Sequence, residues 1–292
     1  MKYQVNKPGI RLDNFLTEVM GVSRNQASKM IKSGEVLVNG IITKGGYIVK
    51  EEDVIEVNHE EEITDIIPEK MELDIVYEDD DVIVVNKANG VVVHPAPGNY
   101  HGTLVNGLLY HTKLSDTNGE VRPGIVHRID AYTTGLLMVA KNNKAHEALA
   151  KQLADKTTHR KYLALVWGVI NNDTGLIDAP IGRSDNDRKK MAISAKGKEA
   201  ITHFKVLKRF AEVTLIELEL ETGRTHQIRV HMDYIGHPIV NDPVYGKKKL
   251  IDDTGQCLHA KEIGFIHPTS GKYMEFDSEL PDKFLNIMKH FE

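Results

Sequence analysis

The sequence predicts an α+β protein in which a small N-terminal domain precedes a larger domain built on a long mixed sheet. A chain of 292 residues with 41% hydrophobic residues can bury one large core and a smaller one. A strongly acidic stretch separates the two regions, and strand-like runs dominate the longer one. We expect domains at residues 1–58 and 71–292, joined by an acidic linker at 59–70.

Charge is distributed unevenly along the chain. Between Glu51 and Asp81 there are fifteen acidic residues and one lysine, a net of −14, so the rest carries +9 although the whole chain is at −5. Residues 11–50 hold six basic and three acidic residues. The net charge therefore does not exclude a nucleic acid partner, although positive charge alone selects no sequence.

Local signals in the small domain predict two helices followed by a hairpin. Ser23 and Gln26 have the spacing of a capping box, in which each side chain satisfies a free backbone donor at a helix start. Gly34 ends that helix. The pair Asn39-Gly40 predicts a type I′ turn in a hairpin over residues 35–43, because this turn needs positive φ angles at both positions.

The larger domain shows several apolar, β-branched runs with one clear helical pattern at residues 144–153. The runs predict strands at residues 82–87, 90–94, 136–140, 161–166 and 213–218. Glu60–Glu62 and Pro68–Lys70 are too polar to pack into either neighbour, which is why we assign them to the linker.

Several classes of protein are disfavoured by what the sequence lacks. Cys257 is the single cysteine, so no intramolecular disulfide framework is possible, and no CxxC or Cys-His cluster indicates structural zinc. No apolar stretch reaches the length of a membrane span or a signal peptide core. We expect a cytoplasmic monomer that contacts no membrane.

Two segments, residues 124–130 and 223–231, place polar side chains next to apolar strands. An aspartate such as Asp130 after a strand is, taken alone, more often a turn or cap residue than a catalyst. Arg224 and His226, at strand-like or loop spacing, could bind an anion, form a surface ion-pair network or belong to the core. His226 and His231 do not have the spacing of the helical zinc pair, which disfavours a metal site.

Four segments of the larger domain resemble, in order, those of one enzyme family. The first contains Asn86-Lys87, Gly90 and Val93-His94-Pro95; the second is His127-Arg128-Ile129-Asp130 with Thr133-Thr134-Gly135-Leu136-Leu137; the third is Lys161 to Val166 with Gly168; and the fourth runs from Gly223 through Gly246. Together they resemble the RluA/RluD-type pseudouridine synthases. Ala88 replaces the proline usual in that family, and residues 131–134 also differ from its common pattern. These differences affect the details of the active-site loop and the substrate preference, and not the reaction that the resemblance implies.

Residues 11–57 are similar to the S4 RNA-binding domain, through Arg11-Leu12-Asp13, Ser23-Arg24, Ile31 to Gly34, Val38 to Gly40 and Asp53 to Ile55. The resemblance implies an RNA-facing surface that carries Arg11, Arg24, Lys29 and Lys32. The alternative for any one of them is an ordinary solvated helix face.

The resemblance to the synthases implies the pseudouridine synthase fold: a mixed, largely antiparallel sheet with flanking helices and a central cleft. It also implies isomerisation of uridine in structured RNA, most often large-subunit ribosomal RNA, without a cofactor or metal. Asp130 would be the catalytic carboxylate, Arg229 the cation that keeps it ionised, and Tyr162 the ring that stacks on the uracil. Arg128 would fill the gap left by the extruded base, with His127, Arg224 and His226 as further substrate contacts.

Other interpretations stay open at this point. The chain could be a non-catalytic RNA-binding assembly factor, its substrate could be transfer RNA, or it could be a metal-dependent RNA hydrolase using His226, His231 and Asp242. A basic run could form a phosphate-binding rim or simply a solvated loop. Its members are Arg183, Arg188, Lys189, Lys190, Lys196 and Lys198.

Overall fold

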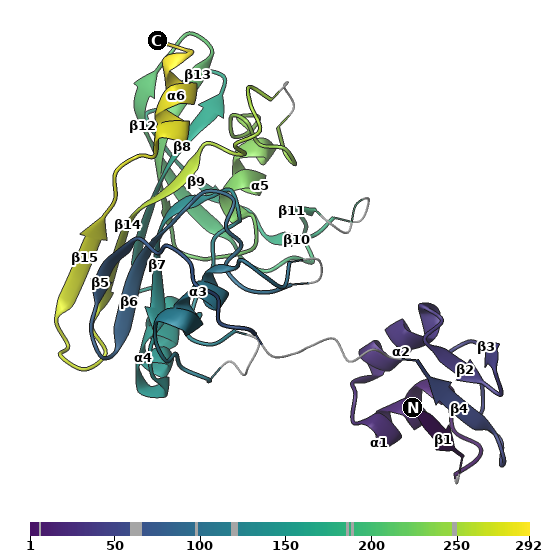
Figure 1. Ribbon diagram of the computed structural model, residues 1–292. Helices are drawn as coiled ribbons and strands as arrows, with labels where there is room; N and C mark the ends of the chain where they lie inside the picture. The colour runs from purple at the N-terminus through teal and green to yellow at the C-terminus, as the bar shows by residue number, and fades with distance from the viewer. Residues whose placement is uncertain are drawn as a thin grey trace. The chain divides into compact units, whose positions relative to one another are not determined.

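The computed structural model describes residues 1–5, 7–58, 66–96, 99–117, 122–184, 187, 190–246 and 250–292. The chain divides into two compact units, Met1–Thr64 and Asp65–Glu292. Figure 1 labels the elements of each unit. No helix among the described residues combines the length and apolar character needed to cross a bilayer.

The first unit packs two helices against a four-stranded antiparallel sheet of order β1-β4-β2-β3. Its elements are β1 (Lys2–Gln4), α1 (Leu12–Met20), α2 (Arg24–Lys32), β2 (Val36–Val38), β3 (Ile41–Ile42) and β4 (Val54–Val57). The predicted capping box is confirmed, since Ser23 and Gln26 exchange side-chain and backbone hydrogen bonds at the start of α2. The turn between β2 and β3 is confirmed too, with φ of 52° at Asn39 and 79° at Gly40.

The second unit contains a nine-stranded mixed sheet of order β5-β6-β7-β14-β8-β13-β12-β9, with β15 paired to β14. Only β7 and β14 run parallel among the described pairs, so the sheet is largely antiparallel as the resemblance implied. The strands are β5 (Ile75–Glu78), β6 (Val82–Lys87), β7 (Thr134–Ala140), β8 (His159–Trp167), β9 (Thr174–Asp178), β12 (Ile201–Arg209), β13 (Val213–Leu220), β14 (Leu258–Ile266) and β15 (Tyr273–Asp277), with a separate hairpin of β10 (Ile181–Arg183) and β11 (Met191–Ile193).

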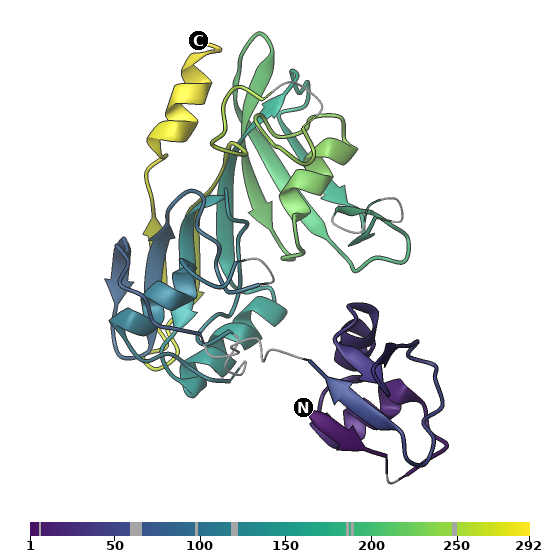
Figure 2. The ribbon, with the colours of Figure 1, turned by 45° about the vertical axis from the view of Figure 1, so that its right-hand side comes forward.

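Helices cover both faces of this sheet, which is why its central strands are apolar on both sides (Figure 2). The helices are α3 (Leu104–His111), α4 (Asn143–Ala154), α5 (Gln227–Tyr234) and α6 (Asp282–Lys289). In β6, Val82 and Val84 join the core under α4, whereas Ile83 and Val85 join the core that includes α3, α5 and α6.

Two expectations about local structure are wrong. Residues 90–94 form no strand, because the carbonyls of Val92 and Val93 accept hydrogen bonds from the first residues of α3. Arg224 and His226 lie in the turn before α5, as the loop alternative allowed, and the helix that begins at Gln227 was not predicted. Glu69, which we placed in a linker that packs against neither domain, accepts a hydrogen bond from the N–H of Gly102 at 2.9 Å and so belongs to the second unit.

Candidate active site

The loop that carries Asp130 is fastened to the sheet on several sides. The N–H of Thr133 donates to the carbonyl of Asp130 at 3.0 Å and closes a turn, while Gln256 donates to the Thr133 hydroxyl at 3.1 Å. At Gly135, with φ of 105°, β7 passes so close to β14 that a Cβ would lie 2.2 Å from the carbonyl oxygen of Ala260. The backbone around Asp130 is therefore held by packing and hydrogen bonds on both sides.

A buried lysine ties the same loop to the end of β6. Lys87 is 2% exposed, and its ammonium donates to the carbonyls of Ala88, Val91 and Ala131 at 2.7 to 2.9 Å. Three acceptors match the three donors of an ammonium group, so the side chain is fully satisfied without a carboxylate. Lys87 thus joins two of the segments that carried the family resemblance.

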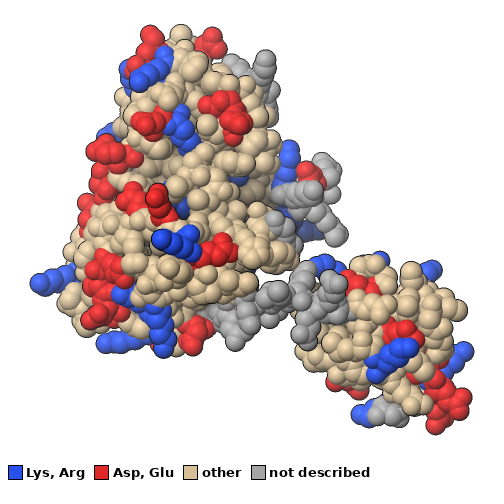
Figure 3. All heavy atoms as spheres, viewed as in Figure 1, with Lys and Arg blue, Asp and Glu red and all other residues tan. Residues whose placement is uncertain are grey.

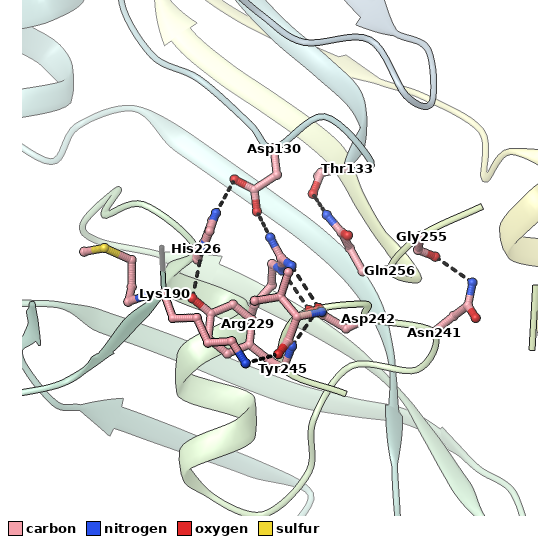
Figure 4. A network of polar contacts seen from close by, with 12 residues as sticks. Asp130, Thr133, Lys190, His226, Arg229, Asn241, Asp242, Tyr245, Gly255 and Gln256 are labelled. Atoms are coloured by element: carbon pink, nitrogen blue, oxygen red, sulfur yellow. Dashed lines mark hydrogen bonds and ion pairs between the residues drawn. The ribbon is translucent and has the colours of Figure 1, made fainter. Parts of the chain in front are cut away.

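The start of α5 positions Arg229. His226 precedes the helix in a left-handed conformation, with φ of 57°, and Gln227 anchors the first turn by donating to the carbonyl of Ile201 at 3.0 Å. Figure 4 shows Arg229 between two carboxylates, Asp130 and Asp242. Residues far apart in the sequence therefore meet at one guanidinium group.

Arg229 divides its donors unequally between these carboxylates. Its Nε and one terminal nitrogen hold the two oxygens of Asp242 at 2.7 and 2.8 Å, and the other terminal nitrogen donates to Asp130 at 2.8 Å. The two-bond pairing of this guanidinium is therefore made with Asp242, and Asp130 receives a single bond. Because Asp242 fixes the guanidinium plane, the remaining N–H points at Asp130.

Burial and charge act in opposite directions on this group of side chains. Burial by itself lowers the pKa of Arg229, but the hydrogen bonds that it donates to Asp242 and the charge of Asp130 more than offset this effect, so that the pKa of Arg229 is raised. Burial raises the pKa of Asp242, and the hydrogen bonds from Arg229 reverse this, so the pKa is lowered overall. Both groups therefore stay charged in a site where Asp242 is 0% exposed.

His226 approaches the carboxylate oxygen of Asp130 that Arg229 does not contact. Its Nε2 lies 3.7 Å from one carboxylate oxygen of Asp130, and its Nδ1 lies 2.8 Å from the hydroxyl oxygen of Tyr245. That hydroxyl also accepts the N–H of Met191 at 2.9 Å. We infer that the Tyr245 hydroxyl donates this hydrogen bond to Nδ1 of His226. The ring proton then lies on Nε2, and its N–H points toward the negative charge of Asp130. Burial lowers the pKa of His226, which favours the neutral ring.

A cavity of about 410 Å³ opens beside Asp130, in the size range of small-molecule sites. Tyr162 lines it from β8, and burial raises the pKa of this phenol, which keeps it protonated. Among the described lining residues Asp130 is the single acidic one, whereas arginines predominate: Arg122, Arg128, Arg160, Arg224 and Arg229. On the face seen in Figure 3, acidic side chains gather instead near β15 and β5. The cavity thus suits an anionic ligand.

Arg128 lies at the boundary between this cavity and a second one of about 260 Å³ that also reaches Asp130. Its side chain donates to Nε2 of His94 at 3.3 Å. Arginine has no acceptor, so His94 must be neutral and carry its proton on Nδ1. Burial lowers the pKa of His94 to about 4, in agreement with that assignment.

The other predicted substrate contacts line the cavity but are partly occupied. The Nε2 of His127 accepts the N–H of Met138 at 3.1 Å, and burial lowers the pKa of His127 to about 3, so this ring is a neutral support for β7. The Nε of Arg224 donates to the carbonyl of Glu199 at 2.8 Å, which leaves the rest of its guanidinium for a ligand. His127 therefore contributes mainly by shaping the cavity.

In the first unit, Asp13 pairs with two of the four predicted RNA contacts. Arg11 donates to it at 2.8 and 3.0 Å and Arg24 at 3.4 Å, and the hydrogen bond from Arg11 is the main reason that the pKa of Asp13 falls to about 2. Lys29 and Lys32 are exposed in the last turn of α2. The two lysines are thus the less compensated charges of the set.

The residues of the alternative metal site do not come together. Both nitrogens of His231 are used, by Thr202 and by the carbonyl of Ala179 at 2.9 Å each. Asp242 is occupied by Arg229 and by the N–H groups of Val244 and Tyr245. This geometry does not support a metal-dependent hydrolase.

The expected basic rim is only partly present. Lys190 is not available as a rim residue, because its ammonium donates to the carbonyl of Val244 at 2.9 Å. Arg183, Lys196 and Lys198 are exposed, whereas Arg188 and Lys189 lie outside the described residues. A continuous phosphate-binding rim is therefore not established.

Sequence reasoning missed the supporting roles of three residues: His94, Asp242 and Tyr245. A signal existed for all three, because Val93-His94-Pro95 and Asp242-Pro243-Val244-Tyr245-Gly246 lie in segments that resemble the synthases. Spacing gave no indication that the second of these would hold Arg229 and His226.

Comparison with known proteins identifies the class to which this fold belongs, which is that of the RNA-modifying enzymes. Residues 81–234 match the family described as RNA pseudouridylate synthase, and residues 10–55 match the S4 domain. The chain belongs to the RNA pseudouridine synthase family, an isomerase class, and carries an RNA-binding S4 domain at its N-terminus.

Particular relatives are similar over nearly their whole length. The RNA pseudouridine synthase YlyB of Bacillus subtilis (strain 168) is 54% identical, with 96% of this chain and 93% of that protein covered. Ribosomal large subunit pseudouridine synthase D of Zymomonas mobilis is 44% identical, with the same coverage of each chain. The structure of human RNA pseudouridylate synthase domain containing 1 is 29% identical, covers 74% of this chain and 86% of its own, and has a TM-score of 0.60.

Proposed function

We propose that this enzyme isomerises uridines of large-subunit ribosomal RNA to pseudouridine, with Asp130 as the catalytic carboxylate. The observation that carries the proposal is the Asp130 carboxylate held 2.8 Å from a buried, doubly paired Arg229 at the edge of an arginine-lined cavity. The ribosomal substrate is supported by relatives named ribosomal large subunit pseudouridine synthase D, at 42% and 44% identity.

The reaction breaks the bond between N1 of uracil and C1′ of ribose and rejoins the base through C5. Neither oxidation nor hydrolysis occurs, so the chemistry requires no cofactor. A carboxylate is needed at the sugar, as a nucleophile at C1′ or as a base at C2′. Asp130 borders the cavity and accepts a hydrogen bond from Arg229, which supports this role, and Tyr162 offers a ring face on which the base can stack.

A uridine in structured RNA must leave its stack before Asp130 can reach its sugar. Arg128 is an exposed residue beside the catalytic loop, and its planar guanidinium can stack in place of the extruded base. The hydrogen bond to His94 orients this side chain without neutralising it. We assign Arg224 and His226 to contacts with the flipped nucleotide.

The substrate class is tested by mapping pseudouridines in cells with the gene, without it, and with the Asp130→Asn variant. We expect a small set of large-subunit ribosomal sites to lose modification in the last two strains. Loss confined to transfer RNA would refute the ribosomal substrate. An unchanged map would favour the non-catalytic assembly factor.

We further propose that Lys29 and Lys32 bind RNA phosphates. The Lys29→Ala/Lys32→Ala variant of the full chain should bind a ribosomal RNA fragment about tenfold more weakly. Each lysine that neutralises a phosphate releases a counterion from the RNA, and this favourable contribution to binding is lost with the contact. Filter binding at several salt concentrations should show a shallower salt dependence. The control removes two exposed lysines of the second unit, in Lys272→Ala/Lys289→Ala. Equal losses in both variants would mean that the effect reflects net charge and not an S4 contact.

A further inference from the structure

Arg160 is a buried cation in the cavity wall that the mechanism above does not use. It is 6% exposed and lies two residues before Tyr162 on β8, so both side chains lie on the same face of the strand. Both line the cavity that Asp130 borders. Arg160 therefore lies beside the position that a ligand stacked on Tyr162 would occupy.

The protein satisfies few of the hydrogen-bond donors of this guanidinium group. Its one hydrogen bond among the described residues is to the carbonyl of Leu220 at 3.3 Å, and its Nε is buried without any partner. No carboxylate of the described part of the chain pairs with it, in contrast to Arg229 with its two aspartates. A buried charge with unused donors costs stability, which indicates that a ligand completes the site.

The neighbouring backbone is shaped to accommodate Arg160. A Cβ at Gly223 would lie 2.9 Å from one terminal nitrogen of the guanidinium. Gly223 does not have a positive φ, so its backbone conformation does not demand glycine. The missing side chain at Gly223 thus provides the space in which the guanidinium lies.

We propose, on the basis of the pseudouridine synthase function, that Arg160 binds the detached uracil and stabilises its negative charge. When the N1–C1′ bond breaks, its electron pair stays on the base and is shared between N1 and the carbonyl oxygens. Asp130 at the same time becomes neutral, either as an ester at C1′ or as the acid that has taken the C2′ proton. Negative charge thus moves from the carboxylate beside Arg229 to the base beside Arg160.

The second half of the reaction reverses this movement. C5 forms the new bond to C1′, and Asp130 returns to the carboxylate by release of the sugar or of the C2′ proton. The proton on C5 is lost and N1 takes one up, so atoms and charge balance without another reactant. A planar guanidinium with free N–H groups can keep a hydrogen bond to the uracil anion while the base rotates, because each orientation of the base presents a carbonyl oxygen.

Arg160→Met keeps the bulk of the side chain and removes its charge, and Arg160→Lys keeps the charge with fewer donors. With saturating enzyme, we expect Arg160→Met to consume the target uridine about 100-fold more slowly than wild type, with partial recovery in Arg160→Lys. The dissociation constant for RNA should change less than threefold. Nuclease digestion followed by chromatography and mass spectrometry measures the remaining nucleoside.

The decisive comparison uses RNA that carries 5-fluorouridine at the target. Fluorine withdraws electrons and stabilises the base anion by itself, so Arg160→Met should slow this substrate at least tenfold less than it slows uridine. Equal losses on both substrates, a wild-type rate, or a large rise in the dissociation constant would overturn the proposal, the last by indicating a phosphate contact. If wild type itself forms no pseudouridine, the proposed function fails instead.

Discussion

Asp130→Asn is expected to lower the rate of pseudouridine formation by roughly 10⁴-fold or more, because asparagine keeps the size of the side chain but cannot act as a nucleophile or base. RNA binding should change less than about threefold, since Arg128 and the S4 domain are untouched. Release of tritium from RNA labelled at C5 of uridine measures the rate, and filter binding measures affinity.

The fold should survive this substitution. Arg229 retains its two hydrogen bonds to Asp242, so loss of the Asp130 charge leaves no unpaired buried cation. Asp253→Asn, at an exposed position of the same unit, is the matched control and should keep the wild-type rate. Tritium release by Asp130→Asn at the wild-type rate would show that Asp130 is not the catalytic carboxylate.

The second large effect is expected at Asp242, which supports the site without facing the substrate. Its carboxylate accepts two hydrogen bonds from Arg229 and two from the N–H groups of Val244 and Tyr245. Asp242→Asn removes the charge from a pair that is almost fully buried and should lower the free energy of unfolding by about 3 to 5 kcal/mol. The reaction should also slow at least about 100-fold, because Arg229 loses the partner that directs it to Asp130.

Stability and positioning can be separated with a double variant. Arg229→Met/Asp242→Asn removes both charges of the ion pair and keeps an acceptor for the N–H groups of Val244 and Tyr245, so its stability should return to within about 2 kcal/mol of wild type. It should still be inactive. Trp167, the single tryptophan, lies in β8, so its fluorescence during urea denaturation reports the second unit alone. A double variant as unstable as Asp242→Asn would contradict the assignment of the lost stability to the unpaired buried charge.

Features decided by near neighbours in the chain were open to prediction. The capping box of Ser23 and Gln26 and the turn at Asn39 and Gly40 depend on residues at most three positions apart, and both occur as expected. The apolar runs of β6, β7 and β8 could be recognised because strands buried on both faces admit few polar residues. In β13 the buried residues alternate with less buried ones, which is also a strand pattern. The apolar run at residues 90–94 was misassigned because its backbone bonds to α3 and not to a strand.

The sequence by itself determined the family resemblance, the two-part organisation and the catalytic roles proposed for Asp130, Tyr162 and Arg229. Only the tertiary structure decided how Asp130 is held, since Arg229 is 99 positions away from it and Asp242 a further 13. Periodicity carries no information about contacts at such separations, because they arise when α5 and the loop after it pack beside the loop before β7. For the same reason nothing in the sequence pattern singled out Arg160, just before the predicted strand at 161–166, whereas packing buries its charge at the cavity with no carboxylate partner among the described residues.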